Sequence, residues 1–339
     1  MVAGRTRRGR KSGGKAGFLR RLTKGSAATA LVAVAVFAAL MAGASIGWWG
    51  ASHFAEKPAP RVVHREPPLV PAPAPPPAAT PAPEPEVAAL PPPALPAPAQ
   101  PGWRRNAIAF VPEPGKPMIA IVIDDMGIDV KRSARIIALP PPLTTSFLSY
   151  AHNLATQARA AHAAGHELML HMPMEPFGTG YDPGPDVLLT AMSDDAIRAR
   201  LRQSLASFSG YVGINNHMGS RFTADERGMH AVMDVLKGDG LLFLDSLTSA
   251  RSVGVKIAGA ERVPNLVRNV FLDDSPDPAA IREQLRRVEE HARRTGSAIA
   301  IGHPRETTLD ALAEWLPAAR AKGFQFVPIS ALAKAKYGQ

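Results

Sequence analysis

The sequence contains no cysteine among its 339 residues. This absence excludes thiol nucleophiles, disulfide-bonded scaffolds and thiolate metal sites together. Any bound metal ion must therefore be held by histidine and carboxylate side chains.

An excess of positive charge is also missing from most of the chain. The sequence pI is about 10.1, yet residues 118–339 carry 24 basic and 24 acidic residues. A nucleic-acid-binding domain needs its basic excess on the folded surface. The sequence therefore argues against nucleic acid as a partner.

Charged residues of either sign are absent from Gly25 to Ala55, whereas residues 1–24 carry nine Lys or Arg and no acid. At ~1.5 Å per residue, Ala27–Trp49 reaches ~35 Å, which exceeds a ~30 Å hydrocarbon core. We predict a basic cytoplasmic tail (1–24) and a transmembrane signal anchor (25–50). The positive flank then places the rest of a single-pass inner (cytoplasmic) membrane protein in the periplasm or an equivalent extracytoplasmic space. A signal peptide cleaved near Ala42-Gly43-Ala44 is the alternative.

Proline is concentrated in one segment: 21 of the 34 prolines lie between Lys57 and Pro117. Such Pro/Ala-rich chain favours extended polyproline II over packed structure. We predict a disordered linker at 51–116 that acts as a spacer, and a folded domain at 117–339.

The folded part alternates apolar runs of strand length with helical segments. This pattern predicts a parallel α/β sheet covered on both faces. Seven or eight repeats favour a distorted (β/α)7–8 TIM-like barrel, with an open doubly wound sheet as the alternative. Strands are predicted at 118–123, 143–148, 167–170, 211–215, 241–244, 266–272, 297–301 and 324–329, and helices near 129–138, 153–164, 194–207, 224–237, 278–294 and 307–320, with Ser193 and Thr223 as helix N-caps.

Polar residues cluster where the predicted strands end, the rim at which such barrels carry their chemistry. They are Asp124-Asp125, Tyr150 with His152, His171, Asn215-Asn216-His217, Asp245, Asp273-Asp274 and His303.

Two adjacent carboxylates at a strand end point in divergent directions, so one can bind a cation while the other meets water. Without cysteine, one aspartate with two histidines is a common oxygen and nitrogen set for a divalent metal such as Zn²⁺. His171 is one candidate histidine, and His217 is the natural third ligand. His303 is a candidate general acid at the same mouth. The histidines within helical segments, which we interpret as structural, are His162, His230 and His291.

At these residues the sequence resembles the divergent polysaccharide deacetylase family, a branch of the NodB-like carbohydrate esterases. Ile121–Gly127 is similar to the family's Thr-Phe-Asp-Asp-Gly motif, in which the first Asp is the general base and the second a metal ligand. Gly165–Pro176 is similar to the strand ending in His-Ser/Thr-x-x-His-Pro, and His303 matches the histidine of the last motif. The resemblance implies a distorted barrel that removes N-acetyl or O-acetyl groups from a glycan, such as peptidoglycan or another acetylated polysaccharide.

The sequence also departs from the family pattern. Glu175 stands where typical members have a second metal-binding histidine, Met126 is inserted before the glycine, and the Arg-x-Pro-Tyr motif is missing. Gly213–Phe222 instead resembles the signature of the divergent branch, which implies that His217 replaces the lost ligand. Further candidates for supporting the ligands or binding substrate are Glu175, His152, Asn216, Arg221 and Asp245.

The resulting hypothesis is metal-assisted hydrolysis in which Asp124 accepts a proton and His303 protonates the leaving amine or alkoxide. Two other classes stay open. One is a catalytically reduced glycan-binding or envelope scaffold protein on the same barrel. The other is a glycosidase, which needs two carboxylates ~5 to 9.5 Å apart and would take Asp245 or Asp273 as the second.

Overall fold

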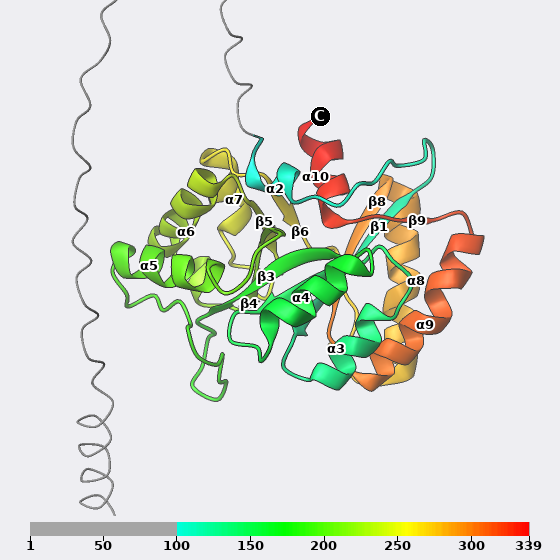
Figure 1. Cartoon of the computed structure of the whole chain (residues 1–339), viewed down its shortest axis with the longest axis horizontal. Helices are drawn as coiled ribbons and strands as arrows, with labels where there is room; N and C mark the ends of the chain where they lie inside the picture. Colours follow the sequence, from blue (N-terminus) through cyan, green and yellow to red (C-terminus); the bar gives the residue numbers. More distant parts are fainter. Residues whose placement is uncertain (1–99, 339) are drawn as a thin grey trace, which may run out of the picture. The chain divides into compact units, whose positions relative to one another are not determined.

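The computed structural model describes residues 100–338 (Figure 1). The predicted cytoplasmic tail, signal anchor and most of the predicted linker lie outside the described residues. Within 100–338, no helix combines the length and the apolar character that crossing a membrane requires.

Nine short strands alternate with helices along the described chain. The strands are β1 (Met118–Met126), β2 (Thr144–Leu148), β3 (Glu167–Met174), β4 (Tyr211–Met218), β5 (Leu242–Asp245), β6 (Asn265–Val267), β7 (Val270–Phe271), β8 (Ser297–Gly302) and β9 (Gln325–Phe326). The helices are α2 (Gly102–Arg105), α3 (Val130–Ile137), α4 (Leu154–Ala163), α5 (Asp194–Leu205), the 3₁₀ turn η1 (Phe222–Ala224), α6 (Glu226–Asp239), α7 (Gly254–Ala260), α8 (Pro278–Thr295), α9 (Glu306–Ala321) and α10 (Ile329–Tyr337).

All strand pairs are parallel, in the order β6-β5-β4-β3-β2-β1-β8-β7, with β9 on β1. Helices α5, α6 and α7 lie to the left of the strands in Figure 1, and α8 and α9 to the right. The buried apolar side chains of all five helices belong to one core with β1, so they cover the same, outer face of the curled sheet. The predicted parallel α/β architecture is confirmed. The sheet is curled into a partial barrel, because β6 and β7 stand at opposite ends of the strand path although only two residues separate them.

Those two residues bridge the seam between the ends of the path. The backbone N–H of Arg268 donates to the carbonyl of Asp245, at the end of β5. The N–H of Asn269 donates to the carbonyl of Ile299 in β8, whose own N–H donates to the Asn269 side chain at 2.7 Å. The predicted strand at 266–272 is therefore split, because each half pairs with a different edge of the sheet.

The strands are buried on both faces, as their continuous apolar runs predict. In β1, Ile119, Ile121 and Ile123 belong to the core between sheet and helices. Ala120 and Val122, which alternate with them, belong to a second core inside the curled sheet. This inner core holds the strands in register and so fixes where their carboxyl ends meet.

The folded region begins before the predicted boundary at residue 117. Trp103, in α2, is 2% exposed and packs in the inner core. Its backbone N–H donates to the carbonyl of Gly240, and the Asn106 side chain donates to the carbonyl of Tyr211, at the start of β4. Burial of this large aromatic side chain offsets the entropic cost of ordering the proline-rich segment around it. Composition alone assigned this segment to the linker.

The last predicted strand, 324–329, forms only Gln325–Phe326, and α10 follows. β9 pairs with β1 at Met118 and Ile119 only, because β2 pairs with β1 from Val122 onward. Helix α6 also begins later than predicted: Asp225 accepts from the N–H of Gly228 as N-cap. Thr223 lies in η1 and donates its hydroxyl to the carbonyl of Gly219. Ser193 caps α5 as predicted.

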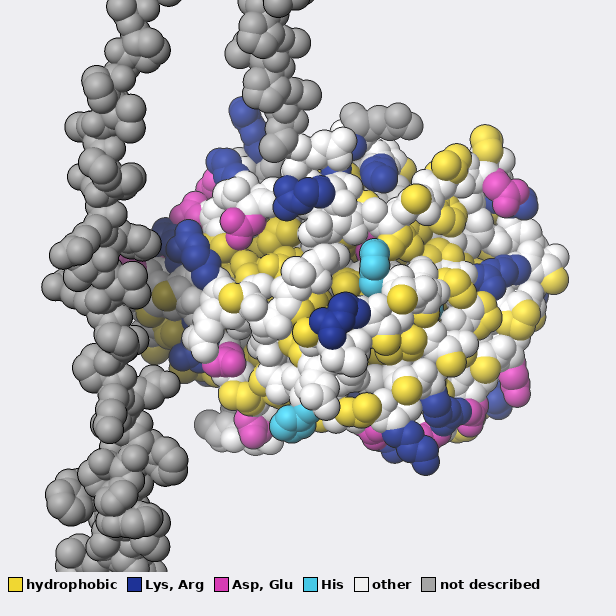
Figure 2. Space-filling view, in the orientation of Figure 1, with side chains coloured by type: hydrophobic (Ala, Val, Ile, Leu, Met, Phe, Trp, Pro, Cys, Tyr) yellow, Lys and Arg dark blue, Asp and Glu magenta, His cyan; other side chains and the backbone are white. Residues whose placement is uncertain are grey.

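The described surface carries charges of both signs side by side. Figure 2 shows Lys and Arg side chains interspersed with Asp and Glu over the face that it draws. This mixture matches the equal numbers of basic and acidic residues from 118 onward.

Candidate functional site

A bulge at the end of β1 sets the direction of the two adjacent aspartates. The register with β2 shifts between Ile123 and Met126, and Asp125 has a φ of 54°. Such left-handed backbone in a non-glycine residue is strained and concentrates at functional sites. The predicted divergence of the two carboxylates is consequently reduced: Asp124 Oδ2 and Asp125 Oδ1 lie 3.6 and 3.3 Å from His171 Nε2.

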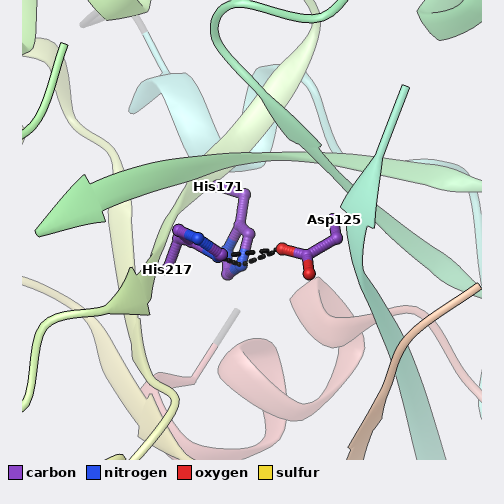
Figure 3. A group of neighbouring side chains, drawn as sticks. All are labelled: Asp125, His171 and His217. Carbon is purple, nitrogen blue, oxygen red and sulfur yellow. Dashed lines mark hydrogen bonds and ion pairs between the residues drawn. The ribbon is translucent and has the colours of Figure 1, made fainter. Parts of the chain in front are cut away.

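Three side chains from three strand ends converge beside this bulge: Asp125 from β1, His171 from β3 and His217 from β4 (Figure 3). Each offers one ligand atom, and these atoms all lie within 4.8 Å of one another. Asp125 Oδ1 is 2.8 Å from His217 Nδ1, and His217 Nδ1 is 3.3 Å from His171 Nε2. The structure thus brings together the three predicted metal ligands.

The chemistry of this cluster fits a divalent metal ion. Asp125 Oδ1 is buried and has no hydrogen-bond partner, despite its closeness to both imidazoles. A buried carboxylate oxygen without a partner costs free energy unless a cation meets it. Two imidazole nitrogens and one carboxylate oxygen are also the usual three protein ligands of catalytic Zn²⁺ sites, which leave a position open.

The side chain of Asn215 determines which nitrogen of His171 faces the cluster. Its Nδ2 donates to Asp124 Oδ1 at 2.8 Å, because an ionised carboxylate only accepts. Its Oδ1 then faces His171 Nδ1 at 2.9 Å and accepts a second hydrogen bond from Ser146. His171 Nδ1 must therefore carry the proton, which leaves the Nε2 lone pair directed at Asp125 and His217.

His303 lies across the mouth and is held by Asp273. The Nδ1 of His303 is 2.8 Å from Asp273 Oδ1, and its backbone N–H donates to Asp273 Oδ2, also at 2.8 Å. Thr308 donates its hydroxyl to the same Oδ2. The opposite nitrogen, Nε2, lies 3.9 Å from Asp125 Oδ2. The structure therefore places His303 at the cluster with its outer nitrogen toward the reacting region.

Sequence reasoning did not pair Asp273 with His303. The sequence placed Asp273 at a strand end, but not next to His303, which is 30 residues away. The pairing of Asp273 with His303 follows from the register of β7 on β8, in which Phe271 pairs with Ile301. Two residues further along both strands, the same register sets Asp273 beside His303.

Burial and neighbouring charges shift the pKa values of Asp124 and Asp125 in opposite directions. Burial raises the pKa of Asp124, and this effect outweighs the nearby His171 and His303. Burial also raises the pKa of Asp125, but His171 and His217 outweigh it and hold that pKa well below its usual range. Asp125 is thus always available as an anionic ligand, whereas Asp124 is the more basic carboxylate.

His171 and His303 both have raised pKa values. Burial lowers the pKa of His171, but the charges of Asp124 and Asp125 outweigh it. Burial likewise lowers the pKa of His303, and the hydrogen bond to Asp273 reverses that effect. At neutral pH, a larger fraction of His303 than of an ordinary histidine therefore carries the second ring proton and can act as a proton donor.

Glu175 lies outside the three-ligand cluster, although it stands at the position of the family's second histidine. Its Oε2 accepts from the backbone N–H and the hydroxyl of Thr190, both at 2.7 Å. Its Oε1 is 3.6 Å from Arg221 Nε. Glu175 and Arg221 therefore form a polar contact on the loops beyond β3 and β4.

The other predicted residues brace loops at the mouth. Asn216 accepts from the N–H of Ser246 and donates to the carbonyl of Met218. Asp245 accepts from the N–H of Leu247 and from the hydroxyl of Ser252. His152 is exposed, and its carbonyl accepts from a buried glutamine side chain.

The family model for divergent polysaccharide deacetylases matches residues 121–333. The chain belongs to this family. The resemblance inferred from the Asp124-Asp125, His171 and His303 motifs is thereby confirmed. The matched range includes every residue of the cluster described above.

Three known proteins are similar to this member of the family. The uncharacterized protein YibQ of Escherichia coli K12 is 38% identical over 218 residues, which span 62% of this chain and 67% of YibQ. The crystal structure of an uncharacterized Agrobacterium tumefaciens protein shares 33% identity with a TM-score of 0.66, covering 68% of this chain and 94% of that one. A CE4 family pseudoenzyme from Bacillus anthracis shares 18% identity with a TM-score of 0.41, covering 65% of this chain and 66% of that one.

Proposed function

We propose that this protein is a metal-dependent hydrolase that removes acetyl groups from an envelope or extracellular polysaccharide. One observation carries the proposal: Asp125, His171 and His217 converge at one mouth, with buried Asp124 beside them and His303 opposite. These are the groups that metal-assisted acyl hydrolysis requires, namely a ligand set with an open position, a base and an acid.

The three side chains of the cluster would hold the metal ion. When bound there, a divalent cation, in our proposal Zn²⁺, polarises an acetyl carbonyl and lowers the pKa of water from ~15.7 toward about 7. Asp124 accepts the proton of the attacking water. Its burial raises its pKa, which makes it a stronger base than an exposed carboxylate, and Asn215 holds one of its oxygens in place.

His303 supplies the proton that the leaving group needs. Asp273 fixes its Nδ1 at 2.8 Å, so the proton available for transfer is on Nε2, toward the mouth. The raised pKa of His303 keeps that proton bound until the C–N or C–O bond breaks. The leaving group then departs as a neutral amine or alcohol.

We further propose that the predicted anchor at 25–50 tethers this domain on the outer side of the cytoplasmic membrane, where acetylated envelope glycans are found. Protease added to spheroplasts should then remove the folded domain and leave a short membrane-bound stub. A domain that is protected until the membrane is lysed contradicts this location.

The direct test is acetate release by the full-length chain, reloaded with Zn²⁺ after chelation. The substrates are acetylated chitooligosaccharides, acetylated peptidoglycan fragments and an acetylated exopolysaccharide. Acetate is expected from at least one of them, with His171→Ala inactive and His230→Ala active. His230 is a matched control because it is exposed on α6 and contacts Glu261, away from the cluster.

A catalytically reduced glycan-binding protein is the second candidate, because Glu175 replaces a ligand histidine and lies outside the cluster. It gains support if the metal-loaded chain releases no acetate from any substrate while glycan affinity survives Asp124→Asn. The glycosidase hypothesis has little to support it: Asp273 is held by His303 and Asp245 by its own loop. Release of reducing sugar without acetate would revive it.

A further inference from the structure

Two arginines from different loops flank one exposed aromatic ring at the rim of the mouth. Phe177 lies beyond β3, Arg221 beyond β4 and Arg251 beyond β5. The guanidinium carbons of Arg221 and Arg251 lie 5.5 and 5.7 Å from the centroid of the Phe177 ring. These three residues, here called the Phe177 cluster, occupy the same edge of the sheet as the proposed metal ligands.

The loops that carry the Phe177 cluster are tied to one another by hydrogen bonds. The N–H of Phe177 donates to the Ser220 hydroxyl at 2.8 Å. The N–H groups of Arg221 and Phe222 both donate to the Glu175 carbonyl at 3.0 Å. The N–H of Val253, two residues after Arg251, donates to the Thr223 carbonyl at 2.8 Å. The cluster is therefore positioned in advance of any ligand.

The positive charge of the Phe177 cluster is only partly balanced. Glu175 Oε1 lies 3.6 Å from Arg221 Nε, while the other oxygen of Glu175 is taken by Thr190. The Arg251 guanidinium forms no salt bridge with any residue of the described range 100–338. Two cations and one carboxylate leave one net positive charge at the rim. Arg198, by contrast, contacts both Asp195 and Asp234.

The Phe177 ring adds an apolar contact next to this charge. Phe177 is 40% exposed, although the guanidinium groups of Arg221 and Arg251 both lie over its ring. Arg221 is four positions after His217 in the sequence, so their Cα atoms are at most about 14 Å apart. A group bound by the cluster therefore lies near the reacting acetyl group, on an adjoining part of the same ligand.

We infer that the Phe177 cluster binds an anionic substituent of the glycan, a carboxylate or a phosphate, while the Phe177 ring packs against a sugar ring. This inference rests on the proposed function and names the class of its substrate. Guanidinium groups form charge-assisted, bidentate hydrogen bonds with both kinds of anion. The deacetylated sugar is then one that lies next to a negatively charged group, and neutral glycans are the poorer ligands.

The test is calorimetric binding of four acetylated oligosaccharides of equal length to the full-length, Zn²⁺-loaded chain. One is neutral, one carries a carboxylate, one carries the methyl ester of that carboxylate, and one carries a phosphate. We expect the preferred anionic oligosaccharide to bind about ten-fold more tightly than the neutral one. The carboxylate and phosphate arms identify which anion it is. Equal Kd values for the acid and its ester, and for the phosphorylated and neutral forms, overturn the inference.

Variants test the assignment to these residues. Arg251→Gln should abolish most of the preference, Arg251→Lys should retain part of it, and Arg202→Gln should retain all of it. Arg202 is the matched control because it is an exposed arginine in the last turn of α5. A preference that survives Arg251→Gln and Arg221→Gln with unchanged thermal midpoints overturns the assignment.

Acetate release measured on the same samples separates this inference from the proposed function. Anion preference without acetate release supports the Phe177 cluster and contradicts the deacetylase activity. Acetate release without anion preference contradicts the cluster alone.

Discussion

Replacing Asp273 with asparagine tests whether His303 is the proton donor. The Asp273 carboxylate accepts three hydrogen bonds of 2.8 Å, two from His303 and one from Thr308. Asparagine has nearly the same shape, but its NH₂ group must face one of these donors. One buried group then loses its partner, and each hydrogen bond to a charged group is worth about 1.5–3 kcal/mol.

Loss of the orientation of His303 should lower turnover strongly. A general acid contributes about 10²- to 10⁴-fold, so Asp273→Asn should lower kcat for acetate release by at least about 10²-fold. Asp274→Asn is the matched control, because Asp274 is the adjacent aspartate and is exposed. If Asp273→Asn retains kcat within about three-fold of the wild-type value, the role of His303 as acid is refuted.

The pH profile gives an independent readout of the same change. Burial lowers the pKa of His303, but the Asp273 carboxylate raises it above its ordinary value of 6.5. The acid form of His303 is lost as the pH rises through this pKa, so activity declines there. Asp273→Asn removes the raising effect, and the alkaline decline should therefore move to lower pH.

The Asp273–His303 pair also determines how the stability of Asp273→Asn should depend on pH. Burial raises the pKa of Asp273, but His303 and Thr308 lower it below its ordinary 3.8, which stabilises the fold above pH 3.8. The raised pKa of His303 stabilises the fold below pH 6.5, and this contribution is lost as the pH rises. The stability deficit of Asp273→Asn should be greatest between these two values, as measured by urea unfolding.

Four further results are expected. Alanine at any of the three proposed metal ligands should lower Zn²⁺ content sharply by elemental analysis, whereas His230→Ala should not; equal content throughout contradicts the site. Asp124→Asn should retain the metal but lose about 10²- to 10⁴-fold in acetate release; retained turnover excludes it as the base. Burial raises the pKa of Glu167 to about 7 from 4.5, so the free energy of unfolding should fall as the pH rises from 4.5 to 7, and Glu167→Gln should flatten this dependence. Trp103→Ala should destabilise the domain by about 3–5 kcal/mol in urea; a much smaller loss means that the segment before residue 117 is not part of the core.

The sequence predicts that these side chains converge, because strand ends can be located from apolar runs. Residues that end such runs in a parallel sheet meet at one rim, so Asp125, His171 and His217 could be grouped without coordinates. The bulge at Asp125 could not be foreseen, because it depends on the local register with β2. It is the bulge that turns both aspartates toward His171.

The features that could not be predicted from the sequence depend on tertiary contacts. The pairing of Asp273 with His303 follows from the register of β7 on β8, which no local pattern encodes. The apolar run ending at Ile329 is typical of a strand. Its helix forms because Thr144 accepts from the N–H of Ile329, and Glu167 accepts from the N–H and hydroxyl of Ser330.

The arrangement of α2 and α10 determines which way the mouth faces. Both elements pack at the amino ends of the strands, where Trp103 contacts Gly240 and Arg104 donates to the carbonyl of Gly338. The proposed catalytic groups lie at the carboxyl ends, so residues 100 and 338, the two ends of the described chain, lie on the opposite side of the sheet from them. Immobilisation on a resin through either end of the described chain should accordingly leave the mouth accessible to polymers as long as a glycan strand.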